Sequence, residues 1–136
     1  MTAEFSGRCL CGAVTFESSS KPMFQANCHC DDCRRSGGST YASYAFVADE
    51  ALTVSGDTAS YQHQSDSGTT MTKMFCANCG SQLFTANSGA AGRRGVRVGA
   101  IEDASWFQPQ ANVYASRKLP STPIDAGVTA FDKMPG

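Results

Sequence analysis

The sequence predicts a single all-β domain, residues 1–136, with little helix. A chain of 136 residues has the length of one ordinary domain. Its apolar residues fall in short segments rich in β-branched and aromatic side chains, bounded by Gly, Asp and Ser. No window keeps the 3.6-residue period of an amphipathic helix, apart from a short turn over residues 31–36. No internal repeat or domain boundary interrupts this pattern.

The expected strands follow one another with turn residues between them. The first, residues 13–16, reads Ala-Val-Thr-Phe after a glycine, and the second, residues 41–47, is rich in aromatic side chains. Glycine-containing segments at 56–57, 67–68 and 89–95 are typical of turns and loops, as are the serines at 18–20. The remaining expected strands are 52–54, 60–63, 70–75, 82–85, 96–98 and 111–114.

Charge and hydropathy exclude several classes of function. The formal net charge is −1, with 11 basic and 12 acidic residues, so the sequence offers no basic surface for nucleic acid. The longest apolar run, residues 44–48, is far shorter than the roughly 18 residues of a membrane span. Residues 1–6 lack the basic and apolar regions of a signal peptide. We therefore expect a soluble, cytoplasmic protein with no nucleic-acid or membrane partner; the sequence does not indicate its oligomeric state.

The cysteines carry the strongest functional signal. An odd number in tight clusters, without an export signal, argues against a disulfide framework. Ordinary buried cysteines would be scattered through the apolar segments, and redox chemistry is a weaker alternative, so the clustering favours metal binding. The seven cysteines are Cys9, Cys11, Cys28, Cys30, Cys33, Cys76 and Cys79.

The spacings within the clusters fit thiolate ligation. Residues i and i+2 of a strand face the same side, so Cys-x-Cys presents two sulfurs together. A tight turn brings the two sulfurs of Cys-x-x-Cys together, and Gly12 and Gly80 follow directly after Cys11 and Cys79. All-thiolate tetrahedral sites select zinc or iron–sulfur clusters. Two iron–sulfur clusters would need four cysteines each, which seven cannot supply, so zinc is the expected metal.

Seven ligands divide most simply into four and three. Cys28, Cys30 and Cys33 can meet one ion without long-range help, which leaves a closed site for the other four. An alternative partition joins Cys30 and Cys33 to the 76–79 pair and leaves Cys28 with the two N-terminal cysteines. The sequence alone does not exclude this alternative. In the favoured partition the structural site consists of Cys9, Cys11, Cys76 and Cys79.

Three protein ligands leave one position of a tetrahedral zinc free for water or substrate. Zinc with three thiolates carries a net charge of −1, so it is a poor generator of hydroxide but accepts another soft sulfur donor. The sequence therefore predicts chemistry on a small thiol at Cys28, Cys30 and Cys33 rather than hydrolysis.

The two histidines and the tryptophan have structural interpretations. His29 lies between two proposed ligands, and in an extended segment it points away from them, so we expect packing rather than zinc ligation. His63 lies in an expected strand, and we expect it to be exposed. Trp106 and Phe107 are expected to pack in the core.

Two arginine pairs stand out. Arg34 and Arg35 follow the last cysteine of the triplet. In a functional interpretation they offset the thiolate charge or bind a substrate carboxylate. In a structural interpretation they are a solvated basic pair beside the neighbouring aspartates. Arg93 and Arg94, in a glycine-rich segment, are expected at the surface.

Taken together, the cysteine motifs resemble those of the glutathione-dependent formaldehyde-activating family, which is related to centromere protein V. The order and spacing of all three clusters match, and the similarity extends over nearly the whole chain. The matching segments are Cys9-Leu10-Cys11-Gly12, Cys28-His29-Cys30-Asp31-Asp32-Cys33-Arg34, Phe75-Cys76-Ala77-Asn78-Cys79-Gly80-Ser81, residues 98–103, residues 112–114 and residues 131–135.

The resemblance implies an Mss4-like β-tent of small antiparallel sheets stapled by zinc. It implies a structural four-cysteine site and a catalytic three-cysteine site, in agreement with the favoured partition. It also implies a carbon–sulfur lyase that joins glutathione to formaldehyde as S-hydroxymethylglutathione, so the expected partners are a small thiol and an aldehyde. The alternatives are a non-catalytic zinc module that binds a protein, and a zinc-storage or redox-sensor protein.

Overall fold

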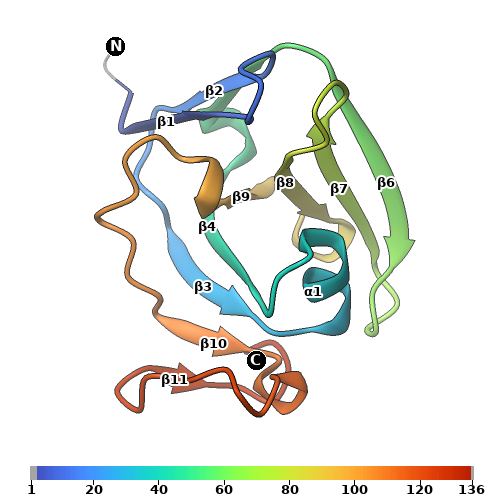
Figure 1. Ribbon diagram of the computed structural model, residues 1–136, viewed down its shortest axis with the longest axis vertical. Helices are drawn as coiled ribbons and strands as arrows, with labels where there is room; N and C mark the ends of the chain where they lie inside the picture. Colours follow the sequence, from blue (N-terminus) through green and yellow to red (C-terminus); the bar gives the residue numbers. More distant parts are fainter. Residues whose placement is uncertain (1–2, 136) are drawn as a thin grey trace.

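The computed structural model describes residues 3–135 and contains two β-sheets (Figure 1). The smaller sheet has three strands in the order β1-β2-β5, and the larger has eight in the order β11-β10-β3-β4-β9-β8-β7-β6. In chain order the strands are β1 (Phe5–Arg8), β2 (Thr15–Ser18), β3 (Phe24–Cys28), β4 (Ala42–Ala48), β5 (Leu52–Ser55), β6 (Thr58–Gln64), β7 (Thr70–Cys76), β8 (Gln82–Asn87), β9 (Arg93–Arg97), β10 (Ala111–Val113) and β11 (Thr129–Ala130).

Helical structure within the described residues is short. The α-helix α1 (Asp31–Gly37) has seven residues, and the 3₁₀ turns are η1 (Asp49–Ala51), η2 (Ser88–Ala90), η3 (Val98–Ala100) and η4 (Ala115–Arg117). None of the helices described has the length and apolar character that a membrane span requires. The expected all-β fold class with little helix is therefore confirmed.

The sheet pairings add detail that the sequence did not predict. Most neighbouring strands are antiparallel, but β10 runs parallel to both β3 and β11. Strands β1, β3 and β11 were not expected, because each is short and has few large apolar side chains. In β3, Phe24, Ala26 and Cys28 alternate with polar residues, and this alternation is the signal that was missed.

The position of β9 corrects the end of the expected loop over residues 89–95. Arg93 and Arg94 belong to this strand, where they are opposite Ala48 and Val47 of β4, and their side chains cover aromatic rings on the sheet's two faces. The Arg93 guanidinium carbon lies 4.8 Å from the centre of the Phe46 ring, and that of Arg94 lies 5.9 Å from Phe84.

The large sheet has a different environment on each face. Along β4, Ala45 and Val47 belong to the main core, whereas Tyr44 and Phe46 face the other way, as the alternation of a strand requires. The small sheet covers the main-core face, and its Phe16 meets Phe84 edge to face with 5.1 Å between ring centroids. The opposite face is thereby left for α1 and the C-terminal segment.

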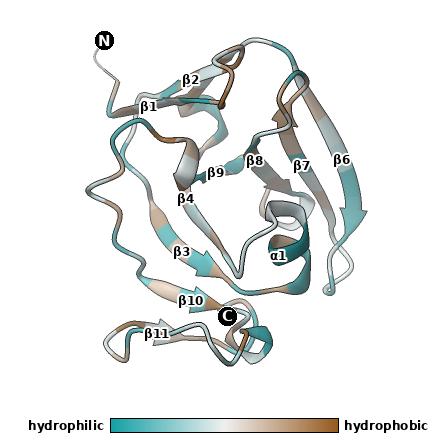
Figure 2. Ribbon diagram, in the orientation of Figure 1, coloured by the Kyte–Doolittle hydropathy of each residue, from teal (hydrophilic) through white to brown (hydrophobic). Residues whose placement is uncertain are grey.

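Figure 1 shows the large sheet curving from β11 at the bottom of the view to β6 at the right, with α1 on its inner side. The strand β6, at one edge of this sheet, is mostly hydrophilic and largely exposed (Figure 2). A polar edge strand of this kind disfavours pairing with another chain. On the inner side of the curve, side chains from β3, β4, β6, β7, β8 and β9 converge on one cavity.

We expect Phe84→Ala to be strongly destabilising, because Phe84 is 1% exposed and fills the contact between the two sheets. The free energy of unfolding should fall by about 3–5 kcal/mol. Tyr61→Ala is the control: Tyr61 is 66% exposed on β6, and its truncation should cost less than about 1 kcal/mol. Urea unfolding at equal metal content measures both; similar losses in the two variants would contradict this assignment of the core.

Candidate metal centres

Two groups of thiols come together in the folded chain. Within each group, all sulfur atoms lie within 4.8 Å of one another. The grouping is four and three, as the favoured partition predicts, and Cys28 lies with Cys30 and Cys33 rather than with the N-terminal cysteines. The four-cysteine group consists of Cys9, Cys11, Cys76 and Cys79, and the three-cysteine group of Cys28, Cys30 and Cys33.

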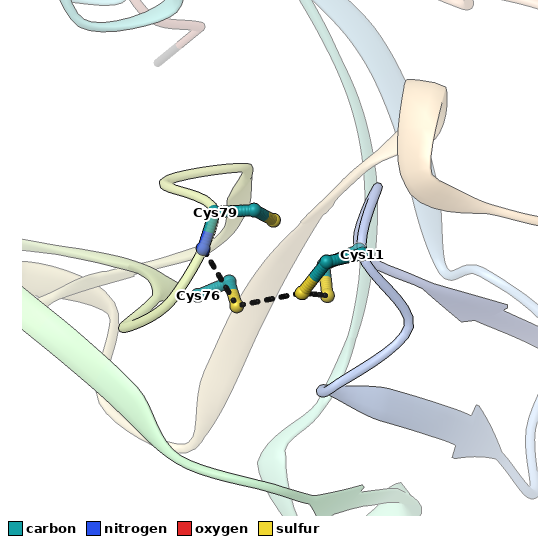
Figure 3. A group of neighbouring side chains, drawn as sticks. Cys11, Cys76 and Cys79 are labelled. Atoms are coloured by element: carbon teal, nitrogen blue, oxygen red, sulfur yellow. Dashed lines mark hydrogen bonds between the residues drawn. The ribbon is translucent and has the colours of Figure 1, made fainter.

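The four-cysteine group connects the two sheets. Cys9 and Cys11 lie in the turn between β1 and β2, whereas Cys76 ends β7 and Cys79 lies in the turn that follows it toward β8. Figure 3 shows the sulfurs of Cys76 and Cys79 on one turn directed toward Cys11 on the other. A metal ion bound here would join the hairpins of two different sheets.

Each turn has the backbone geometry that its cysteines need. Gly12 and Gly80 have φ of 81° and 79°, a left-handed conformation that favours glycine. The Gly80 amide donates to the Cys76 carbonyl at 3.0 Å, closing the turn. The amides of Asn78 and Cys79 then donate to the Cys76 sulfur at 3.3 and 3.4 Å. These hydrogen bonds act to lower the pKa of the Cys76 thiol, but its burial and the neighbouring thiols of Cys9 and Cys79 outweigh them, so its pKa is raised until a metal ion binds.

The spacing of the sulfurs fits tetrahedral zinc. Bonds of about 2.3 Å to a tetrahedral zinc place neighbouring sulfurs about 3.8 Å apart. The Cys9 and Cys11 sulfurs are 3.7 Å apart, and those of Cys11 and Cys76 are 3.8 Å apart. A hydrogen bond from the Ser81 hydroxyl lowers the pKa of Cys79 to about 5, which prepares that sulfur as a thiolate. The donor set therefore fits a closed zinc site.

The three-cysteine group sits where β3 leads into α1. Cys28 ends β3, Cys30 is the N-cap of α1 and Cys33 lies in its first turn. The Cys33 amide donates to the Cys30 sulfur at 3.2 Å, so the cap itself holds two of the thiols together. The Tyr44 hydroxyl lies 3.3 Å from the Cys33 sulfur. Hydrogen bonds with Cys28 and Cys30 lower the pKa of Cys33, whereas hydrogen bonds with Cys30 and Cys33 raise the pKa of Cys28.

All three cysteines of this group line a cavity of about 450 Å³ on the inner side of the large sheet. Phe24, Tyr44 and Phe46 form an aromatic wall, and charged side chains lie around it. The four-cysteine group contributes only Cys9 to a separate hollow of about 340 Å³. The three-cysteine group is thus the one whose members all face a space large enough for a small molecule.

The carboxylates that line this cavity already have partners. Asp31 pairs with Arg34 at 3.4 Å and with Arg117 at 2.6 Å, and the contact with Arg117 lowers its pKa. Asp66 accepts from Tyr114 at 2.7 Å and pairs with Lys133 at 3.3 Å. The loop between β6 and β7 is thereby tied to the C-terminal segment beside the cavity.

The prediction for His29 is confirmed and the prediction for His63 is wrong. His29 is 1% exposed and its Nε2 lies 2.9 Å from Asn112 Oδ1, so it packs and hydrogen-bonds outside the thiol group, as expected. The expected exposure of His63 is wrong: its side chain is 17% exposed, lines the cavity and lies 3.7 Å from Asp32. The curvature of the sheet, which brings β6 over α1, is the reason, and no local sequence pattern records it.

The two arginine pairs also differ in how well they match their expected positions. Arg34 pairs with Asp31 and Arg35 is exposed; neither lines the cavity, so they fit the solvated pair. The surface expectation is wrong for Arg93, which lines the cavity, and Arg94 is held by an ion pair to Asp49.

Trp106 packs as expected: its ring lies 5.5 Å from that of Phe5 at the edge of the main core.

Three residues around the three-cysteine group were not predicted from the sequence. Tyr44 touches Cys33, and Lys73, only 4% exposed, lines the cavity from β7. Arg97 lies between the sheet and α1, 5.0 Å from the Tyr44 ring, and donates to Ser36 Oγ at 3.1 Å. Lys73 and Arg97 lie on strands far from residues 28–33 in the chain, and Tyr44 reaches Cys33 from β4, which pairs with β3, so the sheet brings all three to the thiols.

The fold and these two sites define an all-β protein with two thiol groups, each able to hold a metal ion. The chain belongs to the glutathione-dependent formaldehyde-activating enzyme family, whose sequence model matches residues 4–117. The match covers both thiol groups and every described strand except β11.

Two individual proteins are similar to this chain. A Schizosaccharomyces pombe protein named as an uncharacterized lyase is 25% identical over 83 residues, which are 61% of this chain and 58% of that protein. The chain therefore matches less than two thirds of that relative's length. A crystal structure of a Rhodobacter sphaeroides protein shares 27% identity with a TM-score of 0.58, covering 71% of this chain and 87% of the other.

Proposed function

We propose that the protein is a zinc-dependent carbon–sulfur lyase that forms or cleaves an S-hydroxymethyl-type adduct between an aldehyde and glutathione or a similar small thiol. One observation carries the proposal: three converging thiols face a cavity of about 450 Å³ and leave a tetrahedral ion one position short of saturation. The family's name and the fission yeast relative's designation as a lyase support this class of reaction.

A zinc ion held by Cys28, Cys30 and Cys33 would offer a free coordination position that suits a soft substrate sulfur and would keep that sulfur deprotonated at neutral pH. The chain's own residues fix the ligands. Cys30 is held by the α1 cap, and the Tyr44 hydroxyl donates toward Cys33 from a nearly fully buried ring. Arg97 stacks on that ring and binds α1, so it acts as a positioning residue for both.

The proposed reaction needs no oxidant or reductant. The thiol loses its proton, and its sulfur forms a bond to the aldehyde carbon. The carbonyl π pair moves to the oxygen, which takes up a proton to give the hydroxymethyl thioether. The reverse sequence breaks the same carbon–sulfur bond. The aromatic wall of Phe24, Tyr44 and Phe46 limits the water around the reacting carbon.

The four-cysteine group has a separate role in this proposal. Cys9 and Cys76 are 2% and 1% exposed and belong to the main core, where a saturated zinc would stabilise the packing of the two sheets. We therefore propose a structural zinc at Cys9, Cys11, Cys76 and Cys79 and a catalytic one at the three-cysteine group.

The purified protein tests this function directly. Elemental analysis should find about two zinc ions per chain, one for each thiol group. Calorimetry should show binding of glutathione but not of S-methylglutathione, which lacks the free thiol. Exchange spectroscopy should show that the protein accelerates interconversion of formaldehyde and its glutathione adduct. One zinc per chain with no thiol binding and no acceleration would contradict the proposal and favour a non-catalytic zinc module.

A further inference from the structure

We propose that Lys73 and Arg93 form an anion subsite in the cavity that binds a carboxylate of the thiol substrate. The inference rests on the proposed function and specifies the substrate class: a small thiol that carries a carboxylate, rather than a neutral or cationic thiol. The observations behind it are the position of the two cations on the sheet, the absence of a carboxylate paired with either of them among residues 3–135, and the engagement of the neighbouring acids.

The two cations lie on the same face of the large sheet. Lys73 on β7 is opposite Thr85 on β8, and Thr85 is opposite Gly95 on β9. Arg93 lies two residues from Gly95 along β9, so it shares this face. Two strand spacings separate β7 from β9, about 10 Å, a span that long basic side chains can close from both sides. Both residues line the cavity.

Lys73 is a buried cation without a partner. It is 4% exposed, and among residues 3–135 it has no side-chain hydrogen bond and no carboxylate in an ion pair with it. Its charge acts only at longer range on the three-cysteine group, where it helps to lower the pKa of Cys33. Met71, two residues earlier on β7, lines the same cavity, whereas Met74 packs against the main core, so the strand directs Lys73 into the cavity. A buried ammonium is costly unless an anion or hydrogen-bond acceptor meets it, so this position favours an anionic ligand.

Arg93 is held in place by an aromatic ring rather than by an acid. Its guanidinium lies 4.8 Å from the centre of the Phe46 ring, and it makes no ion pair with the residues that the structure describes. Stacking on a ring orients the planar group while its N–H donors stay available, which suits bidentate binding of a carboxylate. Arg94, its neighbour, is engaged with Asp49 and does not line the cavity.

The acids of the cavity do not neutralise this pair. Asp31 and Asp66 are bound by Arg117 and Lys133, and Asp32 faces His63. The positive charge that these carboxylates do not balance lies on β7 and β9, and the three thiols lie where β3 leads into α1, within range of the Lys73 charge. A ligand with a sulfur at one end and a carboxylate at the other matches this separation of charge.

A pair of probes of nearly equal size tests the subsite. Calorimetry on the zinc-loaded protein would compare 3-mercaptopropionate with 3-mercaptopropionamide, which replaces the carboxylate by a neutral amide. The wild type should bind the carboxylate at least about tenfold more tightly, because ion-assisted hydrogen bonds are the stronger ones. Arg93→Gln and Lys73→Met should each remove most of this preference and leave the affinity for the amide unchanged.

Arg35→Gln is the matched control, because it removes an exposed positive charge outside the cavity and should keep the preference. Arg93→Gln carries the test alone if the buried Lys73 variant fails to fold. Equal affinity of the wild type for both probes would overturn the subsite and leave the proposed thiol chemistry standing. Variants that weaken both probes alike would also overturn it, and would assign the cations to balancing the thiolates. Binding of neither probe would overturn the subsite and the proposed function together.

Discussion

Cys76→Ser should prevent stable folding or lower the melting temperature by more than about 15 °C. Cys76 is 1% exposed and belongs to the main core, and its sulfur accepts hydrogen bonds from two backbone amides. A serine oxygen is a poor replacement for a thiolate at zinc, so the site between the two hairpins would be lost. Structural zinc sites contribute about 10–16 kcal/mol in small domains, which is comparable to the entire stability of a typical domain.

The measurements for Cys76→Ser are soluble yield, zinc content and the thermal transition followed by circular dichroism. A loss of several kcal/mol corresponds to a shift of this size in a chain of 136 residues. Retention of two zinc ions and of the wild-type melting temperature would contradict a structural role for the four-cysteine group.

Cys30→Ser should abolish the chemistry and keep the fold. The substitution is the same as at position 76, but serine is a favourable N-cap residue, so the first turn of α1 keeps a side-chain acceptor for the Cys33 amide. Two thiols remain at the three-cysteine group, too few to hold zinc firmly. We expect about one zinc per chain fewer and an exchange rate lower by at least about 100-fold.

The pair of variants forms one comparison, because each replaces one thiol by one hydroxyl. Calorimetric glutathione binding and the exchange rate are measured beside the melting temperature, which should change by only a few degrees in Cys30→Ser. Global unfolding of this variant would assign a structural role to the three-cysteine group. Full activity would place the reaction elsewhere in the molecule.

The cysteine partition could be predicted because most of it is local. Residues 28–33 form a short segment whose three thiols meet around one helix cap, and Cys76 and Cys79 meet within one turn. The left-handed glycines that follow Cys11 and Cys79 were also predictable, because few other residues adopt that conformation. The favoured grouping of seven thiols then follows largely by elimination.

The cavity could not be predicted in the same way. Arg93 and His63 were expected at the surface because the segments around them are polar, and Lys73 gave no signal at all because it is a single charged residue in a strand otherwise rich in apolar side chains. Their burial depends on how the large sheet curves around α1 and on which strands become neighbours. Pairings such as that of β3 with β10, separated by more than half the chain, leave no trace in a local pattern.

The sequence by itself therefore determined the all-β class, the two thiol groups and the type of ligand they offer, because strand propensity, turn glycines and cysteine spacing act over a few residues. Only the tertiary structure decided that one thiol group joins two sheets while the other faces a cavity that Lys73 and Arg93 also line. The physical reason is that burial and charge balance are properties of the assembled sheet: Lys73 and Arg93 acquire them from strands distant in the chain.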